Sequence, residues 1–364
     1  FKTIANVNKI LEEEADNVQP KEVKEFIKQD LETRIGKATN AAIIWPEESS
    51  KIPDVEPRFV LGYLPLEFSE KKEREQEQTA IELLTQCGVL PRRFRNGIGL
   101  AISDRRQLEG LRRSAKYLLA IDRVREKKAS YKLTKDQMDQ LKEREHTEKS
   151  GFESGVRALY PAVLLLKMEN GKPAIDKAEI GARPLKEQGV HERLMELLGK
   201  NVSSKLFDEF RATKLLTLML MGSGKDEKKA VETKVIRDAF FESLDFPRVT
   251  GEKVIASAIA QGVKDGIFAY ALKSKVLEEA GKHSVKENDA IFGRIVPADE
   301  IDLDSGFILL PECIIKEAPP GPGPTPPGPT PPGPTPPGPT PPGPRPPEPG
   351  KITTVRMDMK LNKQ

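Results

Sequence analysis

Helical and extended hydrophobic patterns alternate over the first part of the chain. Residues 21–35 have apolar positions at helical spacing, and a charged helix is expected over residues 69–87. Three short apolar runs, residues 41–45, 59–64 and 97–103, are bounded by proline and polar clusters and predict strands. Because these runs leave no polar face for solvent, we expect an α/β region with a mostly parallel sheet that is covered on both faces.

The pattern becomes entirely helical from Asp104 onward. Asp104 is a predicted N-cap with Gln107 as its partner, a capping-box arrangement that recurs at Thr134 and Gln137. The first of these helices carries one apolar stripe, made of Leu108, Leu111, Ala115, Leu118 and Leu119. A further helix, rich in aliphatic residues, is expected over residues 152–166 and would pack on both of the others. We therefore expect a helical hairpin after the α/β region.

Helix patterns continue beyond the hairpin and end in short strands. Helices are expected over residues 187–198, 205–221, 228–244 and 251–263, and strands over residues 267–272, 290–296 and 306–310. Two helices followed by a β-hairpin form the order of a winged helix. In winged helices that bind DNA, the second helix lies in the major groove.

The second helix of this predicted module carries little positive charge. Lys253 and Lys264 are its candidate contacts to DNA or to a protein partner, but Glu252 and Asp265 oppose them. Binding to the phosphates of DNA depends on several lysines and arginines. The charge balance therefore favours a structural or protein-contacting winged helix over a DNA-binding one.

A proline-rich repeat precedes the end of the chain. Residues 323–342 repeat Gly-Pro-Thr-Pro-Pro four times, and this period of five excludes a collagen triple helix, which needs glycine at every third position. We expect an extended polyproline-II spacer that reaches roughly 3 Å per residue. Residues 355–361 then alternate like an unfinished strand. With Phe1 at the start, this leads us to expect a piece of a longer protein.

These patterns together predict a fold that is α/β followed by mainly α. The expected divisions are an α/β domain over residues 1–104, a helical domain over 105–200, a winged-helix-like domain over 201–317, a polyproline linker over 318–350 and the start of a truncated domain over 351–364.

The composition adds constraints on the kind of protein. A share of 37% hydrophobic and 32% charged residues predicts two or three folded domains. The net charge of +3 does not by itself mark a nucleic-acid binder. Cys87 and Cys313 are far apart and have no nearby histidine, so we expect no disulfide or zinc site and a reducing cytoplasm. The strongest apolar run, residues 215–221, is too short to span a bilayer.

One glycine segment is similar to the end of a phosphate-binding loop. Gly222-Ser223-Gly224-Lys225 has the closing Gly-Lys pair, but the motif also needs glycine where Met219 stands and serine or threonine where Asp226 stands. The segment also follows a helical pattern instead of a strand. We therefore interpret it as a helix C-cap and loop, because glycine supplies the left-handed cap.

A basic segment before the strand at residues 97–103 is the best candidate site. Arg92, Arg93 and Arg95, followed by Asn96, could meet phosphate charge or act as arginine fingers in an assembled ATPase. The alternative is that these arginines are solvated or paired to nearby carboxylates, which the abundance of surface arginine favours.

Two other residue types need only structural explanations. Trp45 is the only tryptophan, and we expect a core anchor whose indole NH finds a partner. His146, His191 and His283 are scattered without a paired acid and nucleophile at a recognisable spacing, so the sequence supports neither a hydrolase triad nor a metal centre.

Several short segments carry a family resemblance through their order and spacing. They are Phe1-Lys2-Thr3, Asn6-Val7-Asn8-Lys9-Ile10, Ile44-Trp45-Pro46, Ile52-Pro53-Asp54, Arg92-Arg93-Phe94-Arg95-Asn96, Lys116-Tyr117-Leu118-Leu119-Ala120, Gly262-Val263-Lys264-Asp265-Gly266 and, after the repeat, Val355-Arg356-Met357-Asp358. In this order they resemble the C-terminal half of the large prokaryotic ATPases classed under domain of unknown function four-nine-nine. The similarity covers nearly the whole chain.

The resemblance implies an AAA-type P-loop ATPase, encoded in mobile or phage-defence islands beside DNA-modifying or helicase partners. It implies that residues 1–104 are the later part of a P-loop-type sheet, and that ATP and Mg²⁺ are bound by Walker motifs upstream of Phe1. A homo-oligomer, with Arg92, Arg93 and Arg95 near the nucleotide or a subunit interface, is the corresponding hypothesis. It transfers no catalytic residue to this chain.

Two functions follow as expectations. The first is the C-terminal fragment of a DNA-associated AAA-type ATPase in phage defence or genome maintenance, inactive alone because it lacks the Walker A loop. The second is a non-catalytic adaptor that uses a winged helix and a flexible tether to recruit a protein partner.

Overall fold

A computed structural model describes residues 6–36, 41–181, 189–200, 205–219, 221 and 228–316 of the chain. The chain divides into two units, Phe1–Glu317 and Ala318–Gln364, and the second unit lies outside the described residues. The glycine segment at residues 222–225 and the proline-rich repeat also lie outside them, so the predictions for these segments stay predictions.

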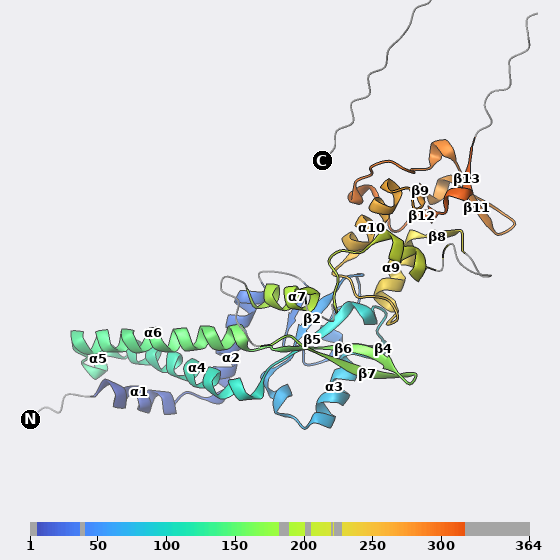
Figure 1. The fold of residues 1–364 in the computed structure, drawn as a ribbon. Coiled ribbons are helices and arrows are strands. Elements are labelled where there is room, and N and C mark those ends of the chain that lie inside the picture. Colours follow the sequence, from blue (N-terminus) through green and yellow to red (C-terminus); the bar gives the residue numbers. More distant parts are fainter. Residues whose placement is uncertain are drawn as a thin grey trace, which may run out of the picture. The chain divides into compact units, whose positions relative to one another are not determined.

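A five-stranded mixed sheet forms the centre of the α/β part (Figure 1). Its order is β1 (Ala42–Ile44), β2 (Val60–Tyr63), β5 (Ile98–Ile102), β6 (Ala162–Glu169) and β7 (Lys172–Glu179). β1, β2 and β5 are parallel, and they confirm the three predicted strands. β6 and β7 add antiparallel pairings, so the sheet is mixed instead of mostly parallel.

The predicted helix over residues 152–166 is wrong in its second half. Helix α6 (Lys135–Ala158) ends before Pro161, and residues 162–166 belong to β6, which is buried throughout this stretch. Proline cannot donate a helical hydrogen bond, and it disfavours helical geometry in the residue before it. A short continuous apolar run fits a strand buried on both faces as well as it fits a helix.

Side chains alternate between two cores on opposite faces of the sheet. Phe59, Leu61 and Tyr63 join a cluster with helices α1 (Val7–Asp16), α2 (Pro20–Leu31), α4 (Arg105–Glu126) and α6. Val60 and Leu100 instead pack with α3 (Glu73–Thr85). This period of two is the geometry of a strand, so both faces are covered as expected.

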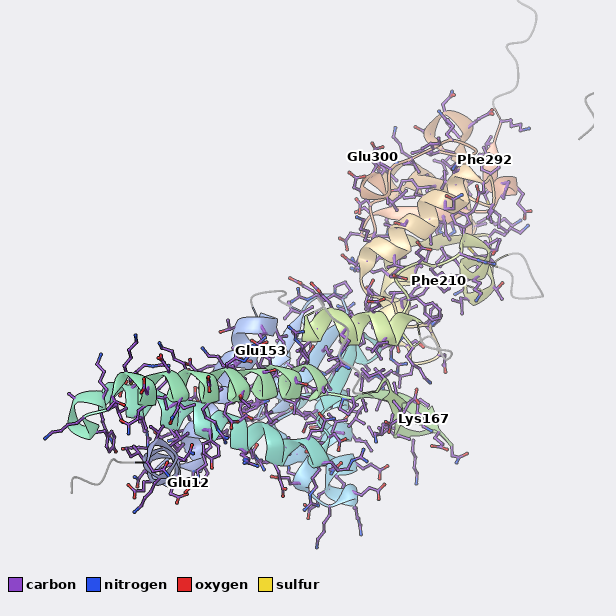
Figure 2. All side chains as sticks on the ribbon, turned by 60° about the vertical axis from the view of Figure 1, so that its left-hand side comes forward. Glu12, Glu153, Lys167, Phe210, Phe292 and Glu300 are labelled. Carbon is purple, nitrogen blue, oxygen red and sulfur yellow. The ribbon has the colours of Figure 1, made fainter. Side chains whose placement is uncertain are left out.

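Helices α4 and α6 form the predicted hairpin, joined through the short helix α5 (Lys128–Tyr131). Thr134 and Gln137 make the expected capping box, with bonds of 3.3 Å and 2.8 Å. Asp104 caps α4 by accepting from the Arg106 amide at 3.0 Å. The predicted box with Gln107 is wrong, because the backbone amide of Asp104 donates to the Leu159 carbonyl at 3.1 Å instead. The apolar stripe of α4 packs into the core, whereas charged side chains such as Glu153 lie on the exposed face of α6 (Figure 2).

Trp45 is the core anchor that the sequence predicted. Its indole Nε1 donates to the Tyr160 hydroxyl at 3.0 Å, and that hydroxyl donates to the Leu64 carbonyl at 3.2 Å. Tyr160 also makes an edge contact with Tyr63, their ring centroids 5.0 Å apart. Trp45 has a φ of 50°, a conformation that is rare for bulky residues, so the surrounding contacts must hold it.

Helix α7 (Val190–Lys200) joins the same core as α1, α2, α4 and α6. Three further helices, α8 (Ala212–Leu218), α9 (Thr233–Glu242) and α10 (Glu252–Lys264), share a separate core beside two small sheets. The strands of the first sheet are β8 (Ala230–Glu232), β12 (Gly306–Leu309) and β9 (Ala269–Leu272), antiparallel in that order, and the second sheet has β10 (Val276–Glu279), β11 (Lys282–Lys286) and β13 (Ile314–Ile315).

The predictions for this region are confirmed in part. Helix α10 and strands β9 and β12 lie where the pattern placed them. The expected strand over residues 290–296 is wrong, because only Ile291 bridges to Tyr270 and Gly293 turns the backbone with a φ of 61°. The expected helix over residues 228–244 begins only at Thr233, after β8.

Removing the indole NH should destabilise the sheet core. We expect Trp45→Phe to lower the free energy of unfolding by about 1–3 kcal/mol, because it leaves a cavity and removes a buried hydrogen bond. Circular dichroism during urea denaturation measures this. In a double-mutant cycle with Tyr160→Phe, the two losses should not add, whereas simple additivity would contradict a coupled pair.

A buried carboxylate makes stability depend on pH. Glu14 on α1 is 3% exposed and accepts from Lys127 Nζ at 2.8 Å and from the Tyr131 hydroxyl. These bonds lower the pKa of Glu14, and they raise the pKa of Tyr131 to about 12. A carboxyl whose pKa is lowered by folding stabilises the protein above its unfolded pKa, about 4.3, and loses this contribution as the pH falls through the folded pKa.

We expect Glu14→Gln to lower the free energy of unfolding at pH 7. The difference from the original chain should shrink as the pH falls from the unfolded pKa of about 4.3 through the lower folded pKa, below which the carboxyl is protonated in both states. Urea titrations at several pH values measure it. A difference that stayed constant down to acid pH would show that the charge of Glu14 contributes nothing.

Candidate functional site

Arg92 is buried at the start of the basic segment and is used for structure. It follows the small hairpin of β3 (Gln86–Cys87) and β4 (Leu90–Pro91), and it is 3% exposed. Its guanidinium donates to four backbone carbonyls, those of Pro53 at 3.1 Å, Ser49 at 3.3 Å, Ile52 at 3.2 Å and Gln86 at 3.0 Å. Burial lowers the pKa of Arg92, while the Asp54 carboxylate at 3.7 Å opposes this effect.

Arg93 is paired with two acidic residues of α9. Its Nε donates to Glu242 at 2.5 Å and its Nη2 donates to Asp238 at 2.9 Å. These carboxylates raise the pKa of Arg93. The backbone amide of Arg93 also donates to Asp54 at 2.6 Å. The Arg93 side chain therefore ties the basic segment to α9.

Phe94 and Asn96 extend the same connection into the interior. Phe94 is 5% exposed and meets the ring of Phe241 edge-on, their centroids 6.4 Å apart. The amide nitrogen of Asn96 donates to the carbonyls of Phe240 at 2.8 Å and Phe246 at 2.9 Å. We name residues 92–97 the arginine joint, because they connect the five-stranded sheet to α9.

The arginine joint is closely packed at its end. A Cβ on Gly97 would lie 2.7 Å from the carbonyl oxygen of Arg58, so only glycine fits there without a shift of backbone. Arg58 in turn bridges to Gly251, immediately before α10. Arg248 adds a bond to the Leu166 carbonyl, and burial lowers the pKa of Arg248 to about 10.

Arg93 and Arg95 are the exposed arginines of this segment, and Arg95 is the one without a partner in the described part of the chain. No hydrogen bond or ion pair of its side chain occurs among the described residues. A cavity of about 650 Å³ lies beside it, lined by Thr85, Gln86, Val89, Pro91, Arg92, Arg93, Arg95, Pro173 and Glu242. Within this cavity, Arg92 and Arg93 already have partners. The arrangement can therefore offer an anion one guanidinium, which is too little to hold a triphosphate.

The two candidate lysines of α10 lie on one exposed face of the helix. Lys253 and Lys264 are both exposed, as is Ser257 between them. Their spacing in sequence returns to the same side of the helix and places them about 16 Å apart along its axis. Glu252 and Asp265 flank this face, and Asp265 accepts from Gln261 at 2.8 Å. The face therefore has little net charge.

The described residues contain no group of three or more side chains suited to a metal ion. His191 Nδ1 lies 3.0 Å from the Tyr63 hydroxyl, and burial lowers the pKa of His191. Arg193, beside it on α7, donates to the carbonyls of Gly181 at 2.9 Å and Tyr160 at 3.0 Å. These buried groups hold the end of α7 against the sheet.

In the same described residues, no helix is both long and apolar enough to cross a bilayer.

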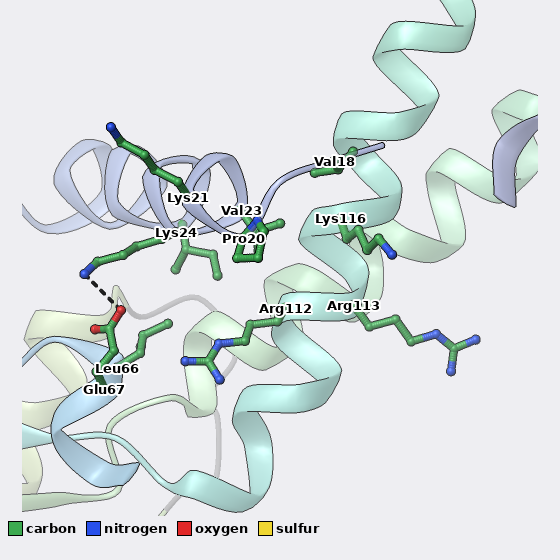
Figure 3. Close-up of a pocket in the computed structure, with 11 residues that line it drawn as sticks. Val18, Pro20, Lys21, Val23, Lys24, Leu66, Glu67, Arg112, Arg113 and Lys116 are labelled. Atoms are coloured by element: carbon green, nitrogen blue, oxygen red, sulfur yellow. Dashed lines mark ion pairs between the residues drawn. The ribbon is translucent and has the colours of Figure 1, made fainter. Parts of the chain in front are cut away.

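A groove between α2 and α4 was not predicted from the sequence. It has a volume of about 530 Å³, and η3 (Leu66–Glu70) closes one side (Figure 3). Its apolar residues are Val18, Pro20, Val23, Ile27 and Leu66, and its charged residues are Lys21, Lys24, Glu67, Arg112, Arg113 and Lys116. The sequence alone places the basic residues of α4 outside its apolar stripe. No local sequence pattern indicates that α2 and η3 pack beside these residues.

Comparisons with family models, with curated proteins and with solved structures found no match. The resemblance to the ATPase family therefore remains an expectation. The functional argument depends on the geometry of the arginine joint, of α10 and of the groove.

The structural role of Arg92 can be tested by a conservative change. We expect Arg92→Lys to lower the free energy of unfolding by about 2–4 kcal/mol, because one ammonium group cannot reach four carbonyls. The matched control is Arg95→Lys, which should change stability by less than about 0.5 kcal/mol. Urea denaturation followed by circular dichroism measures both variants. Equal stabilities would contradict a structural role for Arg92.

Proposed function

We propose that the chain is an accessory, non-catalytic portion of an AAA-type ATPase, and that its residues 201–317 form a winged-helix module that contacts protein. The observation that carries this proposal is the weakly charged exposed face of α10, which holds only Lys253 and Lys264 against Glu252 and Asp265. DNA-binding helices of this kind depend on more numerous phosphate contacts.

The order of elements supports the winged-helix part of the proposal. The chain runs through α8, β8, α9, α10, β9 and β12 in that order. In the antiparallel sheet, β12 lies between β8 and β9. The hairpin of β10 and β11 is inserted between β9 and β12, at the place of a wing. In this arrangement α10 takes the place of the second, recognition helix.

The edges of the five-stranded sheet support the ATPase part. Among the described residues, β1 pairs with β2 alone, and its own residues, Ala42, Ile43 and Ile44, carry no charge. The opposite edge strand, β7, carries lysines and acidic residues, as protected sheet edges do. An uncharged edge can accept further parallel strands. The nucleotide and Mg²⁺ would then be held by Walker motifs upstream of Phe1, as the resemblance implies.

A second candidate function is a non-catalytic adaptor. The occupied side chains of Arg92, Arg93 and Asn96 favour it, because these residues bind their own chain and leave only Arg95 free to act on a nucleotide. If a longer chain carries a complete phosphate loop and hydrolyses ATP, the first function is supported over the adaptor.

Salt-dependent DNA binding tests the protein-contacting interpretation. We expect the 364-residue chain to bind a labelled DNA duplex no more tightly than non-specific binders do, with a Kd of about 10⁻⁶ M or weaker at physiological salt. We expect the double variant Lys253→Glu/Lys264→Glu to bind equally weakly. Fluorescence anisotropy over a series of salt concentrations measures both. Tight, salt-sensitive binding that the double variant loses would assign α10 to DNA instead.

A further inference from the structure

The hairpin of β3 and β4 presents two apolar side chains to solvent. Val89 is 97% exposed, the highest value among the large hydrophobic residues of the described ranges, and Leu90 beside it is 67% exposed. Pro91, which follows, is exposed as well. Apolar side chains that are exposed singly are common on protein surfaces, whereas adjacent ones at the tip of a turn indicate a contact site.

The turn that carries this tip is held in place. Gly88 has a φ of 64°, which glycine readily adopts at the first central position of a two-residue hairpin. The Gly88 amide donates to Ser49 Oγ at 3.0 Å, and the Arg92 guanidinium donates to the Gln86 carbonyl in β3 at 3.0 Å. Because these bonds fix the tip, little further ordering is needed when a second surface covers it.

Hollows of opposite charge lie on the two sides of the tip. Val89 lines the cavity of about 650 Å³ beside Arg95, whose charged residues are three arginines and Glu242. Gly88 lines a smaller hollow of about 260 Å³, whose charged residues are Glu47, Glu48 and Glu82. We name the first the positive hollow and the second the negative hollow.

The charges that the two hollows offer are not neutralised within the described part of the chain. Arg95 has no ion pair there, and neither have Glu47, Glu48 and Glu82, all of which are exposed. Glu48 accepts from Ser50 Oγ at 3.1 Å, which is a neutral donor. Three neighbouring carboxylates repel one another, so a cation that approaches from outside the chain lowers their electrostatic energy.

This order of features is complementary to itself. A two-fold axis through the tip places the tips of two copies against each other. The same rotation places the positive hollow of each copy opposite the negative hollow of the other. The surface therefore supplies both the apolar contact and the opposite charges that a second copy needs.

Other occupants fit this surface less well. A nucleic acid would find a single free guanidinium, Arg95, and its phosphates would be repelled by the three glutamates on the other side of the tip. The same carboxylates oppose the anionic surface of a lipid bilayer. A different protein would have to carry an acidic and a basic group on opposite sides of an apolar patch, an arrangement that the chain itself already has.

We propose that the chain forms a two-fold symmetric dimer through the hairpin of β3 and β4. Val89 and Leu90 of the two copies pack on each other, and Arg95 of each copy pairs with the carboxylates in the negative hollow of the other. Neither a nucleotide nor α10 takes part in this contact. Because two tips and two hollows make a small interface, we expect a weak dimer with a Kd of roughly 10–100 µM.

A charged residue at the tip should break the dimer. Sedimentation equilibrium of the 364-residue chain from about 5 µM to 1 mM measures the Kd. We expect Val89→Asp to raise the Kd about tenfold or more, because the two new carboxylates meet near the axis. The matched control is Ile295→Asp, between β11 and β12, where the original side chain is 80% exposed. It should leave the Kd unchanged within about twofold, and circular dichroism confirms that both variants are folded.

Exchanging charges between the hollows tests the pairing itself. We expect Arg95→Glu and, separately, the triple variant Glu47→Arg/Glu48→Arg/Glu82→Arg to be monomeric, because each variant presents like charges to its own copy. An equimolar mixture of the two variants should restore association, since opposite charges then face each other in both pairs of hollows. The labelled Arg95→Glu chain should sediment in this mixture at the mass of a dimer.

Three results would overturn the dimer. The first is an original chain that stays monomeric up to about 1 mM. The second is an equal effect of Val89→Asp and Ile295→Asp, which would show that the hairpin tip has no special part in association. The third is a mixture of the two charge variants that stays monomeric, because the hollows then do not face each other.

Discussion

The guanidinium of Arg92 satisfies four backbone carbonyls that come from two separate segments. It holds the loop after β1 and the end of α3 in fixed positions, and the next residues then reach α9 through Arg93, Phe94 and Asn96. A buried arginine without these acceptors would cost several kcal/mol, so the loop and the side chain stabilise each other. The connection between the sheet and the C-terminal helices depends on this interaction.

Basic side chains are used differently in the arginine joint and at the groove between α2 and α4. In the arginine joint, the guanidinium groups of Arg92 and Arg93 are used inside the chain, which makes the segment rigid and leaves little charge for a ligand. At the groove between α2 and α4, Lys21 and Arg113 remain exposed, and neither side chain has an ion pair among the described residues. The number of basic residues in a segment is therefore a poor guide to ligand binding. What matters more is whether the tertiary structure places hydrogen-bond acceptors or carboxylates against those residues.

The sequence was sufficient for features that depend on local pattern. The strands at Ile44, Tyr63 and Leu100, the caps at Asp104 and Thr134, and the anchoring of Trp45 follow from apolar runs and side-chain chemistry. The strand β6 was missed because its continuous apolar run has neither a strand nor a helix period, so Pro161 is the only local signal against a helix there. The hairpin of β10 and β11 was missed because it is mostly polar, and only Val276 and Val285 of its strands pack into a small core. The groove could not be predicted, since Leu66 and Arg112 meet only through tertiary packing.

The helical hairpin of α4 and α6 also bears on how the chain can fold. Ile102 at the end of β5 pairs with Ala162 at the start of β6, and all residues between them belong to this hairpin and its ends. Closing a long loop of disordered chain slows the formation of such distant pairings. Antiparallel helices are stabilised by contacts near in sequence, so they can form early and bring the two strand ends together. The insertion that separates β5 from β6 along the chain thereby shortens the search that joins them.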